Sequence, residues 1–359
     1  MDIRQMERQR NSNTLWVKQL FSSVIILLLM LTGCATKIKV NMLQPAQYHQ
    51  ASLTKTVAVL SFSGSGGQEF AAEIEGVLAS KSIDDKQYFI LVDRASIDKT
   101  MSELQFSQSA LIDQKTAAKI GKLVGAQGIY TGSITASQVK DSNYKEKRQE
   151  CVRHKIERDK KGNEYEGYCI QWRNYNVPCT KRDANFSVTP KLIEVSTAKI
   201  LYSRNLSASA SSSGCEDASP PKSEQELLEK VKEDVKRQFI KDIAPYYTTV
   251  EIKLMDSTDQ INSSEAKEKL KQGVDFAGKG RMDNACEIWG QARLLAPVSP
   301  AILYNLGVCA ESRGDAEAAL NLYKQADKLI GKPDENITLA LNRVSLAVKN
   351  RQKLTEQIK

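Results

Sequence analysis

The first 34 residues determine which part of this chain folds as a domain, and in which compartment it does so. Four basic residues precede a short apolar stretch at residues 24–31, and Cys34 follows that stretch. A basic head, an apolar core and small residues in this order are typical of a secretory signal. A membrane-spanning helix needs about 20 apolar residues, so this core is too short to be one. We therefore expect residues 1–33 to be a signal peptide and the remaining chain to fold outside the cytosol.

The run Leu31-Thr32-Gly33-Cys34 resembles the bacterial lipobox. This resemblance implies that Cys34 becomes the lipid-modified first residue of the mature protein, anchored by fatty-acyl chains such as palmitate. Ala35 follows Cys34 in place of the aspartate that favours retention at the inner membrane. We expect a lipoprotein of the outer membrane that faces the periplasm. The alternative is a secretory signal that contains a chance cysteine.

Six further cysteines follow Cys34, and the expected compartment is oxidising. Disulfides are therefore the first interpretation, although the sequence does not reveal their pairing. A zinc site formed by His154 with three of the cysteines is an alternative, but the compact C-x2-C pair of structural zinc sites is missing from the spacing. The candidate disulfide cysteines are Cys151, Cys169, Cys179, Cys215, Cys286 and Cys309.

Strand-like and helix-like patterns alternate along residues 56–255. An apolar run at 56–62 ends in a glycine turn at 64–67, and residues 69–80 then carry apolar side chains at helical spacing. This alternation predicts an α+β fold, an α/β sandwich with a mixed sheet, preceded by a tether at residues 34–55 that contains an edge strand at 37–41. The sequence further predicts strands at 88–92, 127–139, 186–195, 200–206 and 247–255, helices at 97–104, 113–125 and 227–243, and a loop at 207–221.

Short motifs in this region follow the order found in one known family. They are Val-Ala-Val-Leu-Ser-Phe at 57–62, Phe-Ile-Leu-Val-Asp-Arg at 89–94, Thr-Ala-Ala-Lys-Ile-Gly at 116–121, Gly-Ser-Ile at 132–134 and Val-Ser-Thr-Ala-Lys-Ile-Leu at 195–201. With these motifs the chain resembles the CsgG family of curli-secretion lipoproteins over residues 37–255. The resemblance implies a periplasmic domain similar to the N-terminal domain of TolB and to the penicillin-binding-protein activator LpoB.

The segment at residues 140–183 departs from what the family's secretion channel needs. In that channel, the resemblance implies, two hairpins from each subunit join a transmembrane barrel. Residues 140–183 contain twelve Lys or Arg and eight Asp or Glu, and charges facing lipid cost about 2–4 kcal/mol each near the membrane midplane. The second hairpin position, 207–224, is short and polar. We expect the fold to carry over and the pore to be absent; a channel subunit is the alternative function.

The same segment has the pattern of a hairpin in water. Residues 159–163 form a turn signal, and 165–177 are rich in aromatic and apolar residues. Cross-links among its cysteines would hold such an arm, which is too small for a core of its own. The arm is interpreted either as a docking site for an envelope partner or as a decoration pinned by disulfides. Basic and aromatic residues also occur together on nucleic-acid surfaces, but export argues against a nucleic-acid partner.

Residues 264–334 contain an internal repeat with a period of 34 residues, which strongly resembles tetratricopeptide repeats. In such repeats small residues let two helices approach, and a large aromatic residue fills the groove. Residues 335–359 are expected to form a helix that caps the stack. The resemblance implies a module that binds protein partners; the alternative is an appendage that packs on the first domain. The repeat-packing residues are Gly273, Ala285 and Trp289 in the first unit and Gly307, Ala319 and Tyr323 in the second.

The sequence contains no recognisable catalytic constellation. The glycine turn at 64–67 lacks the Gly-Lys-Ser/Thr ending of a phosphate-binding loop, so we interpret it as a tight turn. Neither His49 nor His154 has an evident Ser or Asp partner. We expect no enzyme, no cofactor and no bound metal. The predicted function is a periplasmic scaffold with envelope protein partners, and the sequence leaves open whether the chain forms a homo-oligomer.

Overall fold

The computed structural model describes residues 36–103 and 113–359, which divide into two compact units. The α/β unit consists of residues 44–246 and 350–359, and the helical unit consists of the described residues up to 43 together with 247–349. The predicted signal peptide, the lipobox residues Leu31, Thr32 and Gly33, and the lipidation site Cys34 lie outside the described residues. Within the described residues, no helix combines the length and apolar character that a membrane crossing requires.

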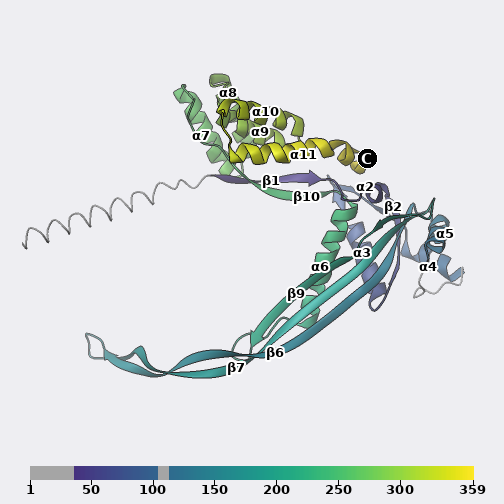
Figure 1. Ribbon diagram of the computed structural model, residues 1–359, viewed down its shortest axis with the longest axis horizontal. Helices are drawn as coiled ribbons and strands as arrows, with labels where there is room; N and C mark the ends of the chain where they lie inside the picture. The colour runs from purple at the N-terminus through teal and green to yellow at the C-terminus, as the bar shows by residue number, and fades with distance from the viewer. Residues whose placement is uncertain (1–35, 104–112) are drawn as a thin grey trace, which may run out of the picture. The chain divides into compact units, whose positions relative to one another are not determined.

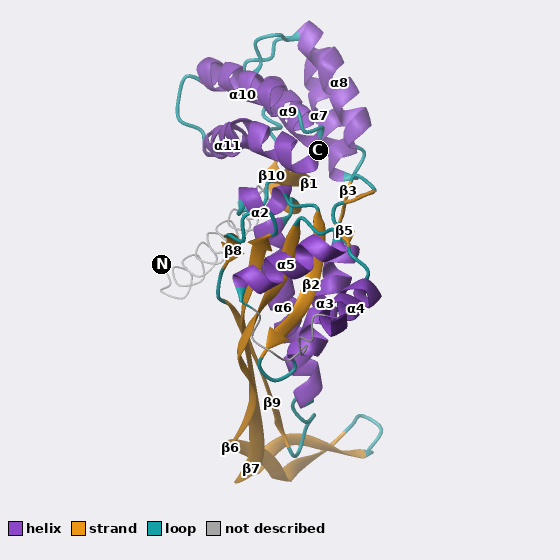
Figure 2. Cartoon of the chain, turned by 90° about the vertical axis from the view of Figure 1, so that its right-hand side faces the viewer, coloured by secondary structure: helices purple, strands orange, loops and turns teal. Residues whose placement is uncertain are grey.

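A six-stranded mixed sheet forms the centre of the α/β unit (Figure 2). The strand β2 pairs in parallel with β5 and β6, whereas β6 and β7 are antiparallel, which confirms the predicted mixed sheet. Both β8 and β9 run along the other edge of β7. The strands are β2 (Thr56–Ser63), β5 (Ile90–Leu91), β6 (Gly128–Arg158), β7 (Glu164–Glu194), β8 (Ile200–Ser203) and β9 (Leu206–Cys215).

Helices cover both faces of this sheet. Successive residues of a strand point to opposite sides, and apolar side chains on both sides are buried by packing against helices. On one face α4 (Arg94–Glu103) and α5 (Gln114–Val124) pack on a buried apolar cluster that includes Ile129 of β6. The next residue, Tyr130, points to the other face, where its ring lies 5.3 Å from that of Phe239 in α6 (Glu224–Ile243). Beside α6, Phe70 of α3 (Gly67–Ala79) packs 5.1 Å from Phe186. The core therefore occupies two layers, one on each side of the sheet.

The glycine turn between β2 and α3 brings two backbones together closely. A Cβ atom on Gly67 would lie 1.9 Å from the carbonyl oxygen of Phe62, and Gly66, which precedes α3, has a φ of +74°. A left-handed φ and so close an approach both require glycine. Steric demands of the turn thus account for these two glycines.

Two regions of the α/β fold differ from the sequence-based expectation. The prediction of a loop at 207–221 is wrong over most of that range. There β9 forms ten consecutive pairs with β7, from Leu206–Val188 to Cys215–Cys179. The predicted strand at 88–92 is reduced to the two residues of β5. A small hairpin of β3 (Ser82–Ile83) and β4 (Lys86–Gln87) precedes it.

Part of the predicted N-terminal tether is folded. Residues Lys37–Gln44 form β1, which joins β10 (Tyr246–Lys253) in a separate two-stranded sheet, and His49–Leu53 form the short helix α2. The strand forms because Ile38, Val40 and Met42 alternate with polar residues, and all three are buried in the core of the helical unit. The sheet β1–β10 therefore belongs to the helical unit for most of its length.

The helical unit repeats one small-against-large contact after 34 residues. A Cβ atom on Gly273 would lie 2.2 Å from the indole nitrogen of Trp289, and one on Gly307 would lie 2.5 Å from the ring of Tyr323. Ala285 and Ala319, which also recur at this spacing, are both fully buried. The helices that follow β10 are α7 (Ser264–Gly278), α8 (Met282–Leu295), α9 (Pro300–Ser312), α10 (Ala316–Ile330) and α11 (Glu335–Ile358), of which α11 belongs to the helical unit up to residue 349. The prediction of an all-α module after the α+β domain is confirmed.

Candidate functional site

The β6–β7 hairpin continues as a two-stranded ribbon past the point where β9 ends. We call residues 144–178 the arm. Figure 1 shows β6 and β7 running together beyond β9 and away from α6. The antiparallel pairing extends from Gly128–Glu194 in the sheet to Arg158–Glu164 next to the turn, so each strand is 31 residues long. The arm is therefore an extension of the central sheet and not a separate domain.

The turn at the end of the arm has the chemistry that its sequence predicts. A carboxylate oxygen of Asp159 accepts the backbone N–H groups of Lys161 at 2.8 Å and Asn163 at 2.9 Å. Gly162 has a φ of +85°. An aspartate that bonds its own following backbone and a glycine in the left-handed region are the usual determinants of a tight connection.

Disulfides hold the arm at its base and further along its length. Cys179 of β7 is bonded to Cys215, the last residue of β9, and both are buried against Val177. Cys151 is bonded to Cys169 within the arm, where three irregularities in the strand register lie between Cys151 and Ile156. The first bond closes the three-stranded part of the sheet, and the second joins the two strands where their regular pairing is interrupted.

These bonds decide between the two interpretations of the cysteines. Zinc is bound by cysteine thiolates, and a cysteine whose sulfur is in a disulfide has no thiolate. Glu146 lies near the sulfur atoms of Cys179 and Cys215, but both sulfurs are bonded to each other. The alternative of a zinc site with His154 is wrong for the same reason, and His154 instead faces Glu166 at 3.3 Å.

The arm exposes many large apolar side chains. Tyr168, Ile170 and Trp172 occupy every second position of β7 and are 62, 48 and 59% exposed. Residues at every second position of a strand share one face of it, and exposed apolar groups gathered on one face of a protein often mark a binding site. The exposed apolar and aromatic residues of the arm are Tyr144, Val152, Ile156, Tyr165, Tyr168, Ile170, Trp172 and Tyr175.

Ion pairs across the hairpin engage several of the acidic residues in and near the arm. Arg158 pairs with Glu164 at 2.6 Å, and Arg173 pairs with Glu150. At the base, Arg182 donates two hydrogen bonds to the carboxylate of Asp141 at 2.6 and 2.7 Å, and this guanidinium holds the pKa of Asp141 below its usual value. Exposed pairs of this kind contribute at most about 1 kcal/mol each. They set the register of the strands more than they stabilise the fold.

An open hollow of about 480 Å³ lies at the base of the arm. It surrounds the Cys179–Cys215 disulfide and is lined by Tyr144, Lys145, Pro220 and Pro221 among others. Its wall of proline, tyrosine and disulfide is apolar, with Lys145 and Glu216 as charged groups. The hollow therefore extends the apolar surface of the arm toward the sheet.

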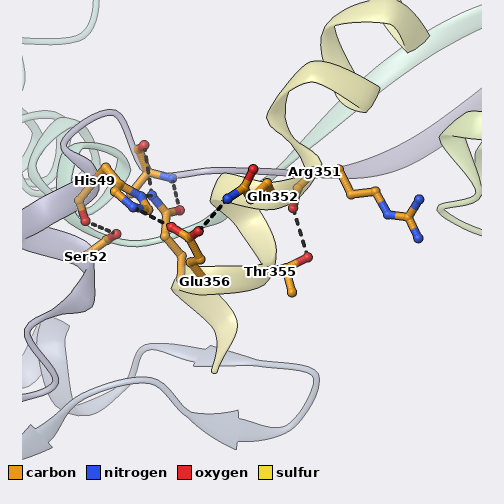
Figure 3. Close-up of polar contacts among 8 residues, drawn as sticks. His49, Ser52, Arg351, Gln352, Thr355 and Glu356 are labelled. Carbon is orange, nitrogen blue, oxygen red and sulfur yellow. Dashed lines mark hydrogen bonds and ion pairs between the residues drawn. The ribbon is translucent and has the colours of Figure 1, made fainter.

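The other histidine, His49, belongs to a polar cluster at the end of the chain (Figure 3). Its ring contacts Glu356 at 3.0 Å and the amide of Gln357 at 3.2 Å. Ser52 donates its hydroxyl hydrogen bond to the backbone carbonyl of His49, at 2.7 Å, and not to the ring. Gln357 is fully buried and accepts the N–H of Ala46 at 2.8 Å. The arrangement fastens residues 350–359 to α2 and does not have the geometry of a catalytic triad.

The profile of the family described as "Curli production assembly/transport component CsgG" matches residues 38–218, which is half of this chain and includes the whole arm. The chain belongs to the CsgG family. Comparison with curated proteins gave no match. The repeat-packing residues Gly273, Ala285, Trp289, Gly307, Ala319 and Tyr323, and the bonded pair Cys286–Cys309, lie in the helical unit, beyond the part matched by the CsgG profile.

Solved structures similar to this CsgG-family chain include three bacterial proteins. The LpoB C-terminal domain from Salmonella enterica is 15% identical, with 43% of this chain and 82% of that chain covered and a TM-score of 0.25. Lipoprotein GNA1162 from Neisseria meningitidis is 13% identical; the alignment covers 52% of this chain and 97% of that chain, with a TM-score of 0.27. The PelC dodecamer from Paraburkholderia phytofirmans is 9% identical; the alignment covers 57% of this chain and 98% of that chain, with a TM-score of 0.22. At these scores the similarity carries no inference about function.

Sequence reasoning missed one contributor to the site, the strand β9. Its residues alternate between serine and small apolar side chains from Leu206 to Ala210, and Cys215 ends the strand. A period of two is the signature of a strand. The low hydrophobicity of serine and alanine concealed it.

Proposed function

We propose that this chain is a non-catalytic scaffold, anchored by lipid at Cys34 to the outer membrane and facing the periplasm, that docks envelope proteins during assembly of a surface structure. The observation that carries the proposal is the arm, which presents exposed aromatic side chains on a ribbon braced by two disulfides. Membership of a family described as an assembly and transport component supports the setting.

The arm has the physical properties of a preorganised binding element. Tyrosine and tryptophan dominate the energetics of protein interfaces because they bury large areas at a low cost in side-chain entropy. The bond Cys151–Cys169 limits the conformations of the free ribbon, which reduces the entropy lost when a partner binds. An isolated two-stranded ribbon without such a brace is marginally stable in water.

The non-catalytic part of the proposal is supported by what the two histidines contact. His49 faces Glu356 and Gln357, and the nearby Ser52 hydroxyl is engaged with a backbone carbonyl. His154 lies in the arm against Glu166. A general base needs a nucleophile or a substrate proton within hydrogen-bond reach, and these contacts have the character of structural links.

The helices of the second unit are the proposed second docking element. Their repeated contacts Gly273–Trp289 and Gly307–Tyr323 follow the tetratricopeptide pattern, in which stacked helix pairs offer a surface for protein segments. The disulfide Cys286–Cys309 joins α8 to α9, which links the first helix pair to the second.

Site-specific photocrosslinking in intact cells tests the docking role. A photoreactive amino acid would replace Tyr168 or Trp172 on the arm, and Lys230 on the exposed side of α6 would be the control position. We expect discrete adducts with one or a few envelope proteins, identified by mass spectrometry, from the two arm positions only. An arm that yields no protein adduct, or the same adducts as Lys230, would contradict the proposal.

A second candidate is a subunit of an oligomeric secretion channel. The family description favours it, and so do the outer edges of β6 beyond Ser133 and of β9, which carry no partner strand in the described residues. Detergent extraction followed by size measurement separates the two candidates. A large ring would support the channel, whereas a monomer or dimer would support the scaffold.

A further inference from the structure

Several basic side chains lie near Thr36, the first described residue. The carbonyl of Thr36 accepts the N–H of Leu254 at 2.9 Å, and at the other end of the ribbon the Thr248 hydroxyl reaches the carbonyl of Met42, so β1 and β10 are antiparallel. Along β1 buried and exposed residues alternate, which places Lys37 and Lys39 on the outer face, and Lys253 of β10 is also exposed. The outer face of this ribbon is thus rich in lysine.

The turn between α7 and α8 lies next to the same point. A Cβ atom on Gly278, the last residue of α7, would lie 2.9 Å from the side chain of Thr36. Lys279 and Arg281 follow directly and are exposed. We call Lys37, Lys39, Lys253, Lys279 and Arg281 the basal patch. All of it belongs to the helical unit.

The charges of the basal patch are only partly balanced by acidic groups. Lys37 pairs with Glu251 at 2.7 Å, and Arg281 bonds to Asn284 and stacks on Phe276. Within residues 36–103 and 113–359, Lys39, Lys253 and Lys279 form no ion pair, although Glu251 also interacts electrostatically with Lys39. The exposed carboxylates Glu251, Asp256, Asp275 and Asp283 are neighbours of the patch in sequence. Five basic residues so close together attract an anionic surface.

Chain length sets how far this patch can be from a lipid anchor. Cys34 lies two positions before Thr36, and two residues of fully extended chain span at most about 7 Å. This step rests on the proposed lipid modification of Cys34. A membrane surface that holds the acyl chains must then lie within about one Debye length, roughly 10 Å, of Thr36 and the α7–α8 turn.

We infer that the basal patch of the helical unit rests on the anionic headgroups of the membrane that holds the lipid anchor. The occupant of this face is a lipid surface, because the covalent tether brings one to it and because phosphate groups complement its charge. A lysine near an anionic membrane surface increases association by about fivefold. The lipid anchor supplies the attachment and the patch supplies the orientation.

Photocrosslinking to lipid tests this orientation with the full-length, lipid-modified chain. The protein would be reconstituted into vesicles of phosphatidylethanolamine and phosphatidylglycerol with a photoreactive residue in place of Lys279 or of Leu294. Leu294 is 85% exposed and lies at the other end of α8, a helix of 14 residues, and therefore about 20 Å from the α7–α8 turn. We expect lipid adducts at position 279 and none at 294. Equal adducts at both positions, or adducts with protein alone, would overturn the inference.

Charge reversal tests whether the lysines cause the orientation. With the photoreactive residue at Asn41 on the same outer face, Lys253→Glu together with Lys279→Glu should lower the lipid adduct at least about fivefold. The loss should disappear in vesicles without phosphatidylglycerol. The control pair Lys328→Glu and Lys332→Glu replaces two exposed lysines outside the basal patch, one in the last turn of α10 and one just after it, and should leave the adduct unchanged. An equal loss in both variants would overturn the role of the patch.

Intact mass spectrometry of the same samples separates this inference from the proposed function. A chain without acyl chains on Cys34 would contradict the lipid-anchored scaffold and the inference together. A correctly acylated chain that gives no lipid adduct at position 279 would contradict the inference alone. Circular dichroism of each variant shows that it is folded.

Discussion

Cys215 ends β9 and is bonded to Cys179, the residue directly opposite it on β7. The bond lies at the last pair of the three-stranded region, and beyond it the sheet has only the two strands of the arm. It closes a loop with a sequence separation of 36. A strand made of serine and alanine buries little apolar area, so this covalent closure is what we expect to keep β9 on the edge of β7.

Removing this bond should release β9. We expect Cys179→Ser combined with Cys215→Ser to lower the free energy of unfolding by about 2–4 kcal/mol and to raise amide exchange along residues 206–215. Hydrogen exchange read by mass spectrometry measures this. The pair Cys151→Ser and Cys169→Ser is the control, since it should raise exchange only in the arm. Unchanged exchange in β9 would show that backbone pairing suffices.

The contact of Gly273 with Trp289 should tolerate no added methyl group. A Cβ atom there would overlap the indole nitrogen, which itself donates to the carbonyl of Leu270 at 3.1 Å. We expect Gly273→Ala to cost about 1–3 kcal/mol through overpacking. Gly290→Ala on α8 is the matched control, because a Cβ atom there meets nothing within 4 Å. Its replacement should stabilise the helix by about 0.5–1 kcal/mol. Chemical denaturation compares the two variants, and equal effects would argue against close packing.

The buried carboxylate of Glu311 should be among the most sensitive positions of the helical unit. It is 4% exposed, accepts a hydrogen bond from Tyr323 at 2.7 Å and pairs with Arg343 of α11. We expect Glu311→Gln to cost about 3–5 kcal/mol, because it leaves the guanidinium without its counter-charge. Thermal unfolding measures this loss. The exposed Glu287→Gln should change stability by no more than about 0.5 kcal/mol; a similar small effect at Glu311 would mean that Arg343 finds water instead.

Lys55 should make stability depend on pH in the alkaline range. Its ammonium group donates to the carbonyl of Gln357 and lies 3.4 Å from the ring centre of Tyr88, and burial lowers its pKa from 10.5 to about 8. Since the folded pKa is the lower one, the unfolded chain binds more protons between pH 8 and 10.5, and folding becomes more favourable as the pH rises through that window. Because Lys55 is only partly buried and solvent screens its charge, the gain should be on the order of 1 kcal/mol.

Comparison with Lys55→Met isolates this contribution. Below pH 8 the variant should be the more stable protein, and its advantage should shrink as the pH approaches 10.5. Lys230→Met on the exposed side of α6 is the control and should show no such trend. Urea denaturation at a series of pH values measures the difference. An advantage that stays constant with pH would mean that the ring and the carbonyl keep Lys55 protonated.

Much of the local structure followed from the sequence because local structure depends on neighbouring residues. The period-two pattern of Ile38, Val40 and Met42 and the helical spacing of Phe70, Ile74 and Leu78 record which side of each element faces a core. The turn at Asp159–Gly162 is likewise set by backbone conformations that only a few residue types favour. The 34-residue spacing of Gly273 and Gly307 predicted two equivalent helix pairs, and the same steric contact occurs in both.

Only the tertiary structure decided which cysteines are bonded to each other and which strands are neighbours. The identity of six cysteines indicated oxidation, but Cys179 bonds Cys215 because β9 happens to run along β7, a relationship between main chains that side-chain patterns do not encode. The same holds for β1, whose pattern marked it as a strand while only its distant partner β10 assigned it to the helical unit. Hydrogen bonds between backbones are alike for every residue type, so periodicity reveals that a strand exists, and the folded chain alone selects its neighbour.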